Sequence, residues 1–262
     1  MPGDGRYEWN GFRDDLPREF DPARGWIATA NHDIHPPGYD PPLFFKTGPQ
    51  TARYDRIVSL LGQGDRFTVA DMARMQHDAF NAAAIRDLER FRGWTARDSA
   101  LERARVLLAG WDGWQRKESS AAALWSFVPR TGPGEAGLRQ GLSELIATQG
   151  PDPAEWRWGR VHRSELPHPL VAAYDIAPVQ RSGGAGTVAA TGATYRQIVD
   201  FSDLDGSLAT NFPGQSGQPG SPFYANLAGP YGRGEYFPLA FSRAAVERHA
   251  AHRLWLLPAK PR

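Results

Sequence analysis

The sequence predicts a protein that mixes helices and strands, of the α/β or α+β class. The expected elements follow the order strand, helices, strands and helix. Hydrophobic residues make up 41% of the 262 residues, and nine residues are Trp. No internal repeat or low-complexity segment is present. A chain of this composition can bury the core of one large domain or of two small ones.

The first expected element is a strand over "GWIATA", residues 25–30. The strand is bounded by Gly25 at its start, and Asn31 follows it at the start of a loop that is crowded with His and Pro. The rest of residues 1–51 is rich in Gly, Pro and aromatic residues, and we expect ordered loop there. This first part of the chain is therefore strand- and loop-rich.

Residues 52–150 are expected to be mainly helical. A helix of about six turns is predicted over residues 68–91, where Thr68 and Asp71 have the spacing of a capping box. A second helix is predicted over residues 99–110, with Ser99 as its N-cap.

Two more helices complete this helical segment. Residues 119–128 favour a third helix, which ends before Pro129. Residues 137–147 favour a fourth helix, which Gly141 weakens because glycine lowers helix propensity.

Residues 151–262 are expected to be strand- and loop-rich again. A helical turn should begin at Asp152, with Pro153 in its first turn. Ser242 should cap a short helix near the end of the chain. Strands are predicted over residues 159–166, 194–203 and 253–257, and an ordered wrapping loop over residues 211–239.

Charge and cysteine content exclude several classes of function. The 30 basic and 29 acidic residues give a net charge of +1, and the basic residues form no stripe, so nucleic acid is not an expected partner. The absence of cysteine excludes disulfides, thiolate zinc sites and cysteine nucleophiles. No apolar run is long enough to span a membrane, and the chain as written starts without a signal peptide, so no membrane partner is expected.

Histidines offer weak candidate sites. His32 and His35 form H-x-x-H, but they sit in a proline-containing loop instead of on a helix, so we interpret them as loop histidines and not as zinc ligands. His162 and His168 could catalyse a reaction, although histidines on strands more often make structural hydrogen bonds.

Other isolated motifs are also weak. Ser216 in "GQSG" lacks the strand and helix that flank a serine nucleophile, so a turn is expected there. Pro2 could expose a secondary amine as a base once Met1 is removed, but nothing else supports that role. Arg53 and Arg56 in "TARYDRI" are either surface cations or anion anchors.

Several blocks in order resemble one family over nearly the whole chain, from about Tyr7 to Leu257. The blocks are "YEWNGF", "GWIATANHDI", "ARYDRI", "MARMQHDAF", "LLAGWDGW", "WGRVHRSELPHPL", "GATYRQIVDFSD" and "FPGQSGQPGSPFY". Together they resemble the C-terminal part of the β chain of the penicillin acylase family, the N-terminal-nucleophile (Ntn) amidohydrolases. The resemblance implies an α+β fold: the C-terminal portion of a four-layer αββα hydrolase, with the helical segment inserted between strands.

The resemblance also implies a site. Asn31 matches the family asparagine whose amide donates into the oxyanion hole, and Arg56 matches the arginine that orients the site, with Arg53 as the alternative match. Phe223 stands where similar members often have His, so a contact of that His would be missing. The family often carries a structural calcium, but Asp40 matches its ligands too loosely to be assigned.

The implied function is hydrolysis of a linear amide in an acylated amine, such as a β-lactam antibiotic side chain or an acyl-homoserine lactone. The family nucleophile is a Ser made N-terminal by autocatalytic cleavage of a zymogen, and it lies upstream of the matched region. This chain alone is therefore expected to be inactive, with the missing N-terminal portion and the α chain of the precursor as partners and the periplasm or secretion as its location. Two alternatives remain: a catalytically incomplete fragment or structural complement of a separate subunit, and a self-sufficient α+β binding module.

Overall fold

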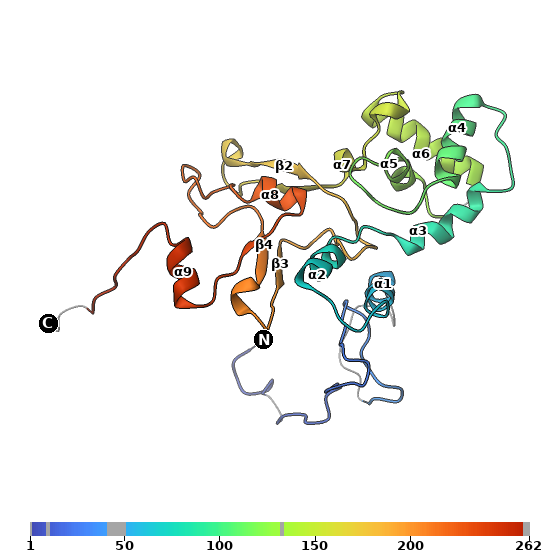
Figure 1. Cartoon of the computed structure of the whole chain (residues 1–262). Coiled ribbons are helices and arrows are strands. Elements are labelled where there is room, and N and C mark those ends of the chain that lie inside the picture. Colours follow the sequence, from blue (N-terminus) through green and yellow to red (C-terminus); the bar gives the residue numbers. More distant parts are fainter. Residues whose placement is uncertain (1, 9–10, 41–50, 132–133, 259–262) are drawn as a thin grey trace. The chain divides into compact units, whose positions relative to one another are not determined.

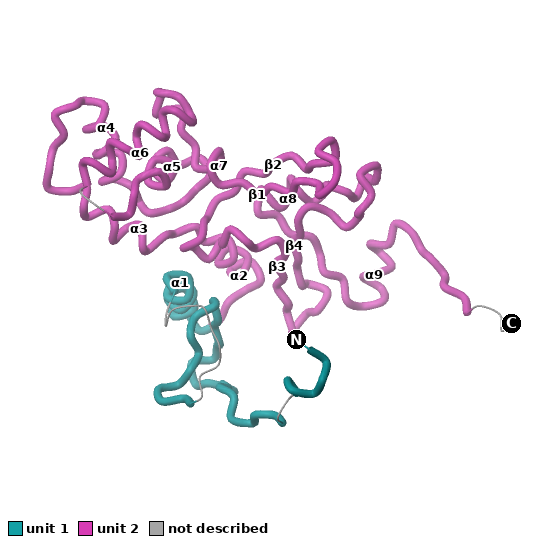
Figure 2. Tube along the Cα trace, turned by 180° about the vertical axis from the view of Figure 1, so that it is seen from behind, with its two compact units in different colours: residues 1–65 teal, residues 66–262 magenta. Residues whose placement is uncertain are grey.

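The structure is a computed structural model that describes residues 2–8, 11–40, 51–131 and 134–258. The chain divides into two compact units, residues 1–65 and residues 66–262 (Figure 2). The expectations for residues 41–50 and for the "WN" of "YEWNGF" lie outside the described residues. In the described ranges, no helix has both the length and the hydropathy needed to cross a membrane.

In its described residues, unit 1 contains the helix α1, over Ala52–Leu61 (Figure 1). It begins at Thr51, whose side chain accepts a hydrogen bond from the Tyr54 amide. The strand expected over residues 25–30 is not formed. A strand needs a hydrogen-bonded neighbour, and no described segment pairs with these residues.

Helices form most of the first half of unit 2 (Figure 1). They are α2 (Val69–Gln76), α3 (Ala82–Asp87), η1 (Leu88–Phe91), α4 (Ser99–Ala109), α5 (Ser120–Phe127), α6 (Gly134–Gln149), η2 (Pro153–Glu155) and α7 (Trp158–Val161). Their core contains the largest buried cluster of the described residues, and the middle of α5, Ala121 to Trp125, is buried throughout. These helices thus enclose one hydrophobic core of their own.

The single helix expected over residues 68–91 is wrong: it divides into α2, α3 and η1. Between α2 and α3, Phe80 forms a β-bridge with Trp114, and the Asn81 amide donates to the Gly113 carbonyl. The Asn81 side chain then caps α3. Pairing with a distant loop therefore replaces the helical hydrogen bonds that the local pattern favoured.

Gly141 has a packing role in α6. A Cβ there would lie 2.8 Å from Val128 Cγ2 and 2.9 Å from the Val128 backbone nitrogen. The glycine lets α6 approach the end of α5 closely, which explains why the longest helix of the described chain tolerates a weak helix former.

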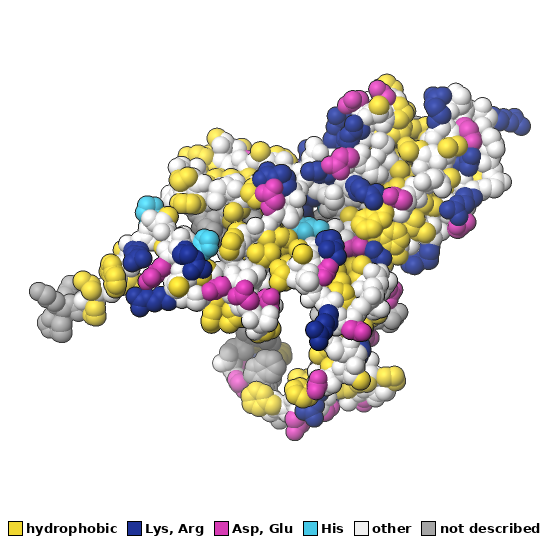
Figure 3. Space-filling model, in the orientation of Figure 1, with side chains coloured by type: hydrophobic (Ala, Val, Ile, Leu, Met, Phe, Trp, Pro, Cys, Tyr) yellow, Lys and Arg dark blue, Asp and Glu magenta, His cyan; other side chains and the backbone are white. Residues whose placement is uncertain are grey.

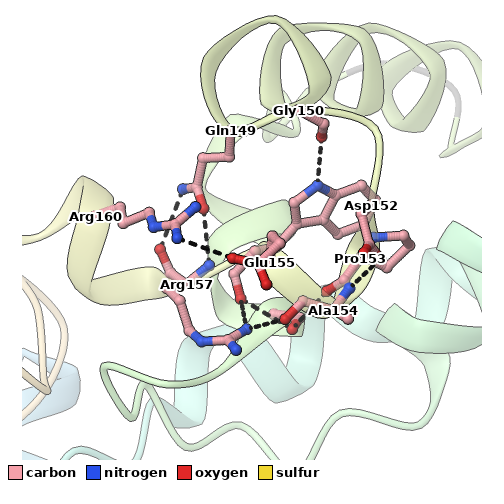
Figure 4. A network of polar contacts seen from close by, with 10 residues as sticks. Gln149, Gly150, Asp152, Pro153, Ala154, Glu155, Arg157 and Arg160 are labelled. Carbon is pink, nitrogen blue, oxygen red and sulfur yellow. Dashed lines mark hydrogen bonds and ion pairs between the residues drawn. The ribbon is translucent and has the colours of Figure 1, made fainter.

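A polar network closes the helical part beyond α6 (Figure 4). The Asp152 carboxylate caps η2 at the Ala154 amide, as expected from the Asp-Pro pair. The Gln149 side chain makes two hydrogen bonds with the Arg157 backbone, of 2.8 and 3.1 Å. These bonds hold the connection between α6 and α7 in place.

The remainder of unit 2 carries two small antiparallel sheets. β1 (Arg163–Leu166) pairs with β2 (Ile176–Gln180), and β4 (Leu208–Asn211) lies between β3 (Tyr195–Ile198) and β5 (Phe237–Pro238). The short helices in this part are η3 (Ala172–Tyr174), η4 (Leu204–Gly206), α8 (Ala228–Arg233) and α9 (Arg243–His249). A second core joins the two sheets to α8 through Ile176, Phe212, Ala228 and Tyr231.

The strand predictions for this part are correct only in part. Residues 159–166 begin as α7 and become a strand at Arg163, and residues 194–203 form only β3. The strand expected over residues 253–257 is not formed, and its apolar side chains are exposed (Figure 3). Ser242 does cap α9, through a hydrogen bond from the Ala245 amide.

Candidate functional site

The turn at Asn31 holds an exposed amide in a defined backbone conformation. Asn31 has φ of +56°, in the left-handed region that asparagine tolerates better than most residues. The residue before it, Ala30, is buried, whereas the Asn31 side chain is exposed. A buried anchor followed by a left-handed turn projects this amide toward solvent.

The N-terminus of α1 fixes this turn. Arg53 Nη2 donates to the Ala30 carbonyl over 2.9 Å and to Asn31 Oδ1 over 2.5 Å. The Thr51 hydroxyl, which caps α1, also donates to the Ala30 carbonyl over 3.3 Å. One cap and one arginine of the same helix thus hold both the backbone and the side chain of the turn.

The contact with Arg53 determines which atom of the Asn31 amide remains available for another hydrogen bond. Since guanidinium nitrogens only donate, the atom facing Arg53 must be the amide oxygen. Nδ2 accordingly points away as a donor, and no described residue accepts a hydrogen bond from it. A fixed N–H donor beside a guanidinium charge can stabilise negative charge on an incoming carbonyl oxygen.

Arg56, the other arginine singled out in the sequence, lies three residues further along α1. It is half-buried and has interactions of its own. Its assignment as the orienting arginine stays a prediction, but the guanidinium that donates to Asn31 Oδ1 is that of Arg53. The sequence offered both arginines and no signal for which one faces the turn.

The H-x-x-H histidines have separate partners. The His32 ring stacks on Tyr54 with a centroid distance of 3.8 Å, and His35 Nδ1 lies 2.6 Å from an Asp33 carboxylate oxygen. The His35 backbone amide also donates to this carboxylate and lowers the pKa of Asp33. Within the described ranges, no group of three or more His, Asp or Glu residues could hold a metal ion.

His162 and His168 have structural partners. His162 is buried, stacks on Trp158, and makes ring hydrogen bonds to the Arg181 carbonyl and the Thr191 hydroxyl. Burial lowers its pKa, so the neutral ring is favoured. His168 Nδ1 accepts hydrogen bonds from two backbone amides of the following turn.

The remaining candidates lie in loops. Ser216 sits in a turn closed by the Phe223 carbonyl, and its hydroxyl accepts a hydrogen bond from the Gln218 amide. Phe223 is half-exposed, and both Pro2 and Asp40 are exposed. The context required of a serine nucleophile, a preceding strand and a following helix, is absent around Ser216 in the described structure.

Comparison with known families adds to this geometry. The family model described as "Penicillin amidase" matches residues 1–132 and 134–248. The match includes Asn31, Arg53 and Arg56.

Curated relatives with similar sequences are acyl-homoserine lactone acylases. The QuiP acylase of Pseudomonas syringae pv. tomato is 26% identical, with 99% of this chain and 43% of the relative covered. The QuiP acylase of Pseudomonas fluorescens Pf0-1 is 25% identical, with 99% and 42% covered. The chain therefore spans less than half of the length of these relatives.

Among solved structures, a thermostable penicillin G acylase from Alcaligenes faecalis is similar in fold. The TM-score is 0.53 at 17% sequence identity, and the match covers 99% of this chain and 62% of the other. This likeness agrees with the expected α+β class.

Proposed function

The chain belongs to the penicillin amidase family, and we propose that it contributes the oxyanion-hole asparagine, Asn31, to a larger amidohydrolase. The observation that carries this proposal is the bond from Arg53 to Asn31 Oδ1, which leaves the Asn31 Nδ2 donor facing outward. An amide donor held in this way meets the geometric need of an oxyanion hole.

The reaction that fits this donor is hydrolysis of a linear amide in an acylated amine. A serine hydroxyl attacks the amide carbonyl, and its proton passes to the serine's own α-amine and then to the leaving amine. In the tetrahedral intermediate, the Asn31 Nδ2–H donates to the oxyanion, while Arg53 keeps Oδ1 turned away. Water then hydrolyses the acyl-enzyme. The serine belongs to a portion of the enzyme outside these 262 residues.

The names of the relatives support the proposed substrate class. The similar curated proteins are named as acyl-homoserine lactone acylases, so an acyl-homoserine lactone is favoured over a β-lactam side chain. Its amide joins a fatty acyl group to the amine of homoserine lactone.

The partner is the remainder of the same precursor. Support comes from exposed apolar side chains, among them Phe12 and Phe20 in unit 1 and Leu254, Trp255 and Leu256 in unit 2. Large apolar side chains in continuous exposed segments indicate surfaces that are covered in the complete protein.

Two further properties are proposed from the family alone. The complete enzyme is periplasmic or secreted, and it carries a structural calcium whose ligands lie mainly outside this chain. Both follow from the family resemblance and from no contact within the described residues.

The rival proposal is a catalytically incomplete fragment or a structural complement of a separate subunit. The observation that favours it is that the chain spans only 43% of a full-length relative. The two proposals differ in whether a polypeptide with an N-terminal Ser accompanies this chain.

Purification from the native cells decides between them. Every polypeptide that copurifies is analysed by intact mass and N-terminal sequencing, and the assembly is assayed with an acyl-homoserine lactone for release of homoserine lactone. A partner or a longer form that starts with Ser, together with amide hydrolysis, supports the proposed enzyme. This chain found alone, without hydrolysis, would reject it.

A further inference from the structure

Unit 2 contains a basic cavity far along the sequence from Asn31. Its volume is about 350 Å³, within the range of small-molecule sites. The charged and aromatic lining consists of Arg74, Arg181, Arg196, Arg233, His77 and Tyr231, which come from α2, the end of β2, β3 and α8. None of the described residues that line it is Asp or Glu.

The two outer arginines have carboxylate partners of their own. Arg74 pairs with Asp71, and Arg233 pairs with Glu235 through two hydrogen bonds of 2.6 and 2.9 Å. Both guanidinium side chains are largely exposed. They therefore mark the open rim of the cavity and carry charges that are already balanced.

The two inner arginines are buried without a counter-ion. Arg181 and Arg196 are 5% and 9% exposed. The Arg181 guanidinium donates only to neutral oxygens, namely the Ser164 hydroxyl and the Ala190 and Thr191 carbonyls. In the described part of the chain, neither arginine forms an ion pair with a carboxylate. Buried charges in proteins are ordinarily paired, so this arrangement lacks a negative partner.

Two polar side-chain nitrogens in the cavity have no hydrogen-bond partner among the described residues. They are Arg196 Nη2, which can only donate, and His77 Nε2, which donates when the ring is protonated; both are shielded from solvent. The Tyr231 ring lies beneath both inner guanidinium groups, with centroid distances of 4.8 Å to Arg181 and 5.6 Å to Arg196. The two unpartnered nitrogens and the two uncompensated charges thus lie in one preformed cavity.

The titration of the neighbouring groups is consistent with this excess of positive charge. Burial, with Arg196 and Arg181 close by, lowers the pKa of His77 to about 4. Burial also lowers the pKa of Arg181. Among the described residues, the paired Arg74 and Arg233 also line the cavity, and the Tyr236 ring packs edge-on against His77 at a centroid distance of 5.5 Å. The surplus of positive charge therefore disfavours a further proton on His77.

We propose that this cavity binds a small dianionic oxyanion, such as phosphate or a short dicarboxylate, between Arg181, Arg196 and His77. Two guanidinium charges are balanced by two negative charges, and the forked donors of arginine match the oxygens of phosphate and carboxylate groups. The orphaned Arg196 Nη2 donates to the anion. His77 Nε2 becomes a second donor once the anion favours its protonation.

Inorganic phosphate is the first probe. The intact protein, with every polypeptide that accompanies it in its native cells, is titrated with phosphate while the ring signals of His77 are followed by NMR and binding is measured by calorimetry. Phosphate should bind saturably and raise the pKa of His77 from about 4 toward its ordinary value. Succinate tests the dicarboxylate source. Acetate carries one charge, so its affinity should be at least about tenfold lower than that of phosphate.

Variants separate a built site from general basic charge. Arg196→Gln should lower phosphate affinity at least about tenfold, and Arg196→Lys should lower it less, since lysine retains the charge but not the fork. The matched control is Arg116→Gln, which removes an exposed arginine paired with Asp112 outside the cavity and should leave the affinity unchanged. If Arg196→Gln does not fold, the test compares the phosphate affinity of Arg196→Lys with that of the wild type and of Arg116→Gln.

Two results would overturn the proposal. One is saturable phosphate binding that Arg116→Gln weakens as much as Arg196→Lys does. The other is a wild-type His77 pKa already near 6.5 and insensitive to phosphate and succinate. That second result would mean that a carboxylate of another part of the protein fills the cavity. Amide hydrolysis is not a readout, so the outcome is independent of the proposed activity.

Discussion

Arg53 and Asn31 are joined side chain to side chain across 22 residues of sequence, by a hydrogen bond from Nη2 to Oδ1. The same Arg53 nitrogen holds the Ala30 carbonyl. The Asn31 amide is therefore oriented by a charged group on α1, and its Nδ2 donor faces outward. This relationship makes the candidate site testable by single substitutions.

Asn31→Gly should remove the donor without straining the backbone. Glycine adopts the φ of +56° readily, whereas alanine there would add a backbone cost. In the complete, correctly processed enzyme, we expect Asn31→Gly to lower kcat about 100-fold or more, as the loss of one oxyanion donor does. Steady-state kinetics with an acyl-homoserine lactone measure this, and mass spectrometry confirms processing. Unchanged kcat would remove Asn31 from the oxyanion hole.

Arg53→Met should act through Asn31. The methionine retains much of the packing volume but cannot donate to Oδ1, so the amide can rotate and present its oxygen instead of Nδ2. We expect kcat to fall about tenfold or more with little change in KM, because a positioning contact is lost. Arg53→Lys should recover part of the loss.

Arg56→Met is the matched control on the same helix. It should cause a smaller loss, with substrate binding or precursor processing affected. If Arg56→Met lowers kcat more than Arg53→Met does, the positioning role belongs to Arg56, as the sequence resemblance implied.

Gly141 and Gly137 make a matched pair on α6. Gly141→Ala should destabilise unit 2 by about 1–3 kcal/mol, because the new Cβ would lie 2.8–2.9 Å from Val128. Gly137→Ala meets only contacts of 3.7–3.8 Å, so the higher helix propensity of alanine should stabilise by up to about 1 kcal/mol. Urea unfolding monitored by circular dichroism measures both, and effects of the same sign would contradict the close approach at Gly141.

Two neighbouring residues, Asp98 and Ser99, are candidates for the N-cap of α4. The sequence pattern favours Ser99, but the structure places Asp98 at the N-cap, where its carboxylate accepts from the Leu101 amide. Asp98→Ala should cost about 1 kcal/mol of unfolding free energy. Ser99→Ala should change it by less than about 0.5 kcal/mol. The reverse order in urea unfolding would restore Ser99 as the cap.

Local signals in the sequence predict helix starts well. Thr68 and Asp71 form both bonds of the expected capping box, and Ser242 caps α9 as predicted. These motifs are recognisable because the capping side chain and its backbone partner lie within three residues of each other. At α4 the predicted cap, Ser99, is wrong by one residue, because the neighbouring Asp98 is an equally good capping residue and occupies the N-cap.

Long-range pairing explains what the sequence could not predict. The break between α2 and α3 depends on hydrogen bonds from Asn81 to Gly113 and from Gln115 to Ala79, which no local pattern indicates. The strands expected over residues 25–30 and 253–257 are absent because a strand requires a partner, and none lies beside them in the described residues.

The site shows the same division. The resemblance pointed to Asn31, but its partner could not be chosen from sequence, because Arg53 and Arg56 lie one turn apart on α1. Only the fold shows which guanidinium faces the Asn31 turn. The cavity around Arg196 gave no signal at all, since its lining comes from segments far apart in the chain.

His77 should make the stability of unit 2 depend on pH. Its pKa is about 4 in the folded chain against an ordinary 6.5, so below pH 6.5 the unfolded chain binds a proton that the folded chain does not. Stability is therefore fully present above pH 6.5 and is lost as the pH falls toward 4, with a slope of at most about 1.4 kcal/mol per pH unit.

His77→Gln should flatten this dependence, because glutamine does not titrate. The measurement is urea unfolding at several pH values between 7 and 5 in a buffer without multivalent anions, with His249→Gln as the control for an exposed histidine. His162, whose pKa burial also lowers, contributes a slope of the same sign that remains in the His77 variant. Identical pH slopes in wild type and His77→Gln would show that His77 is not held neutral by burial and by the two arginines.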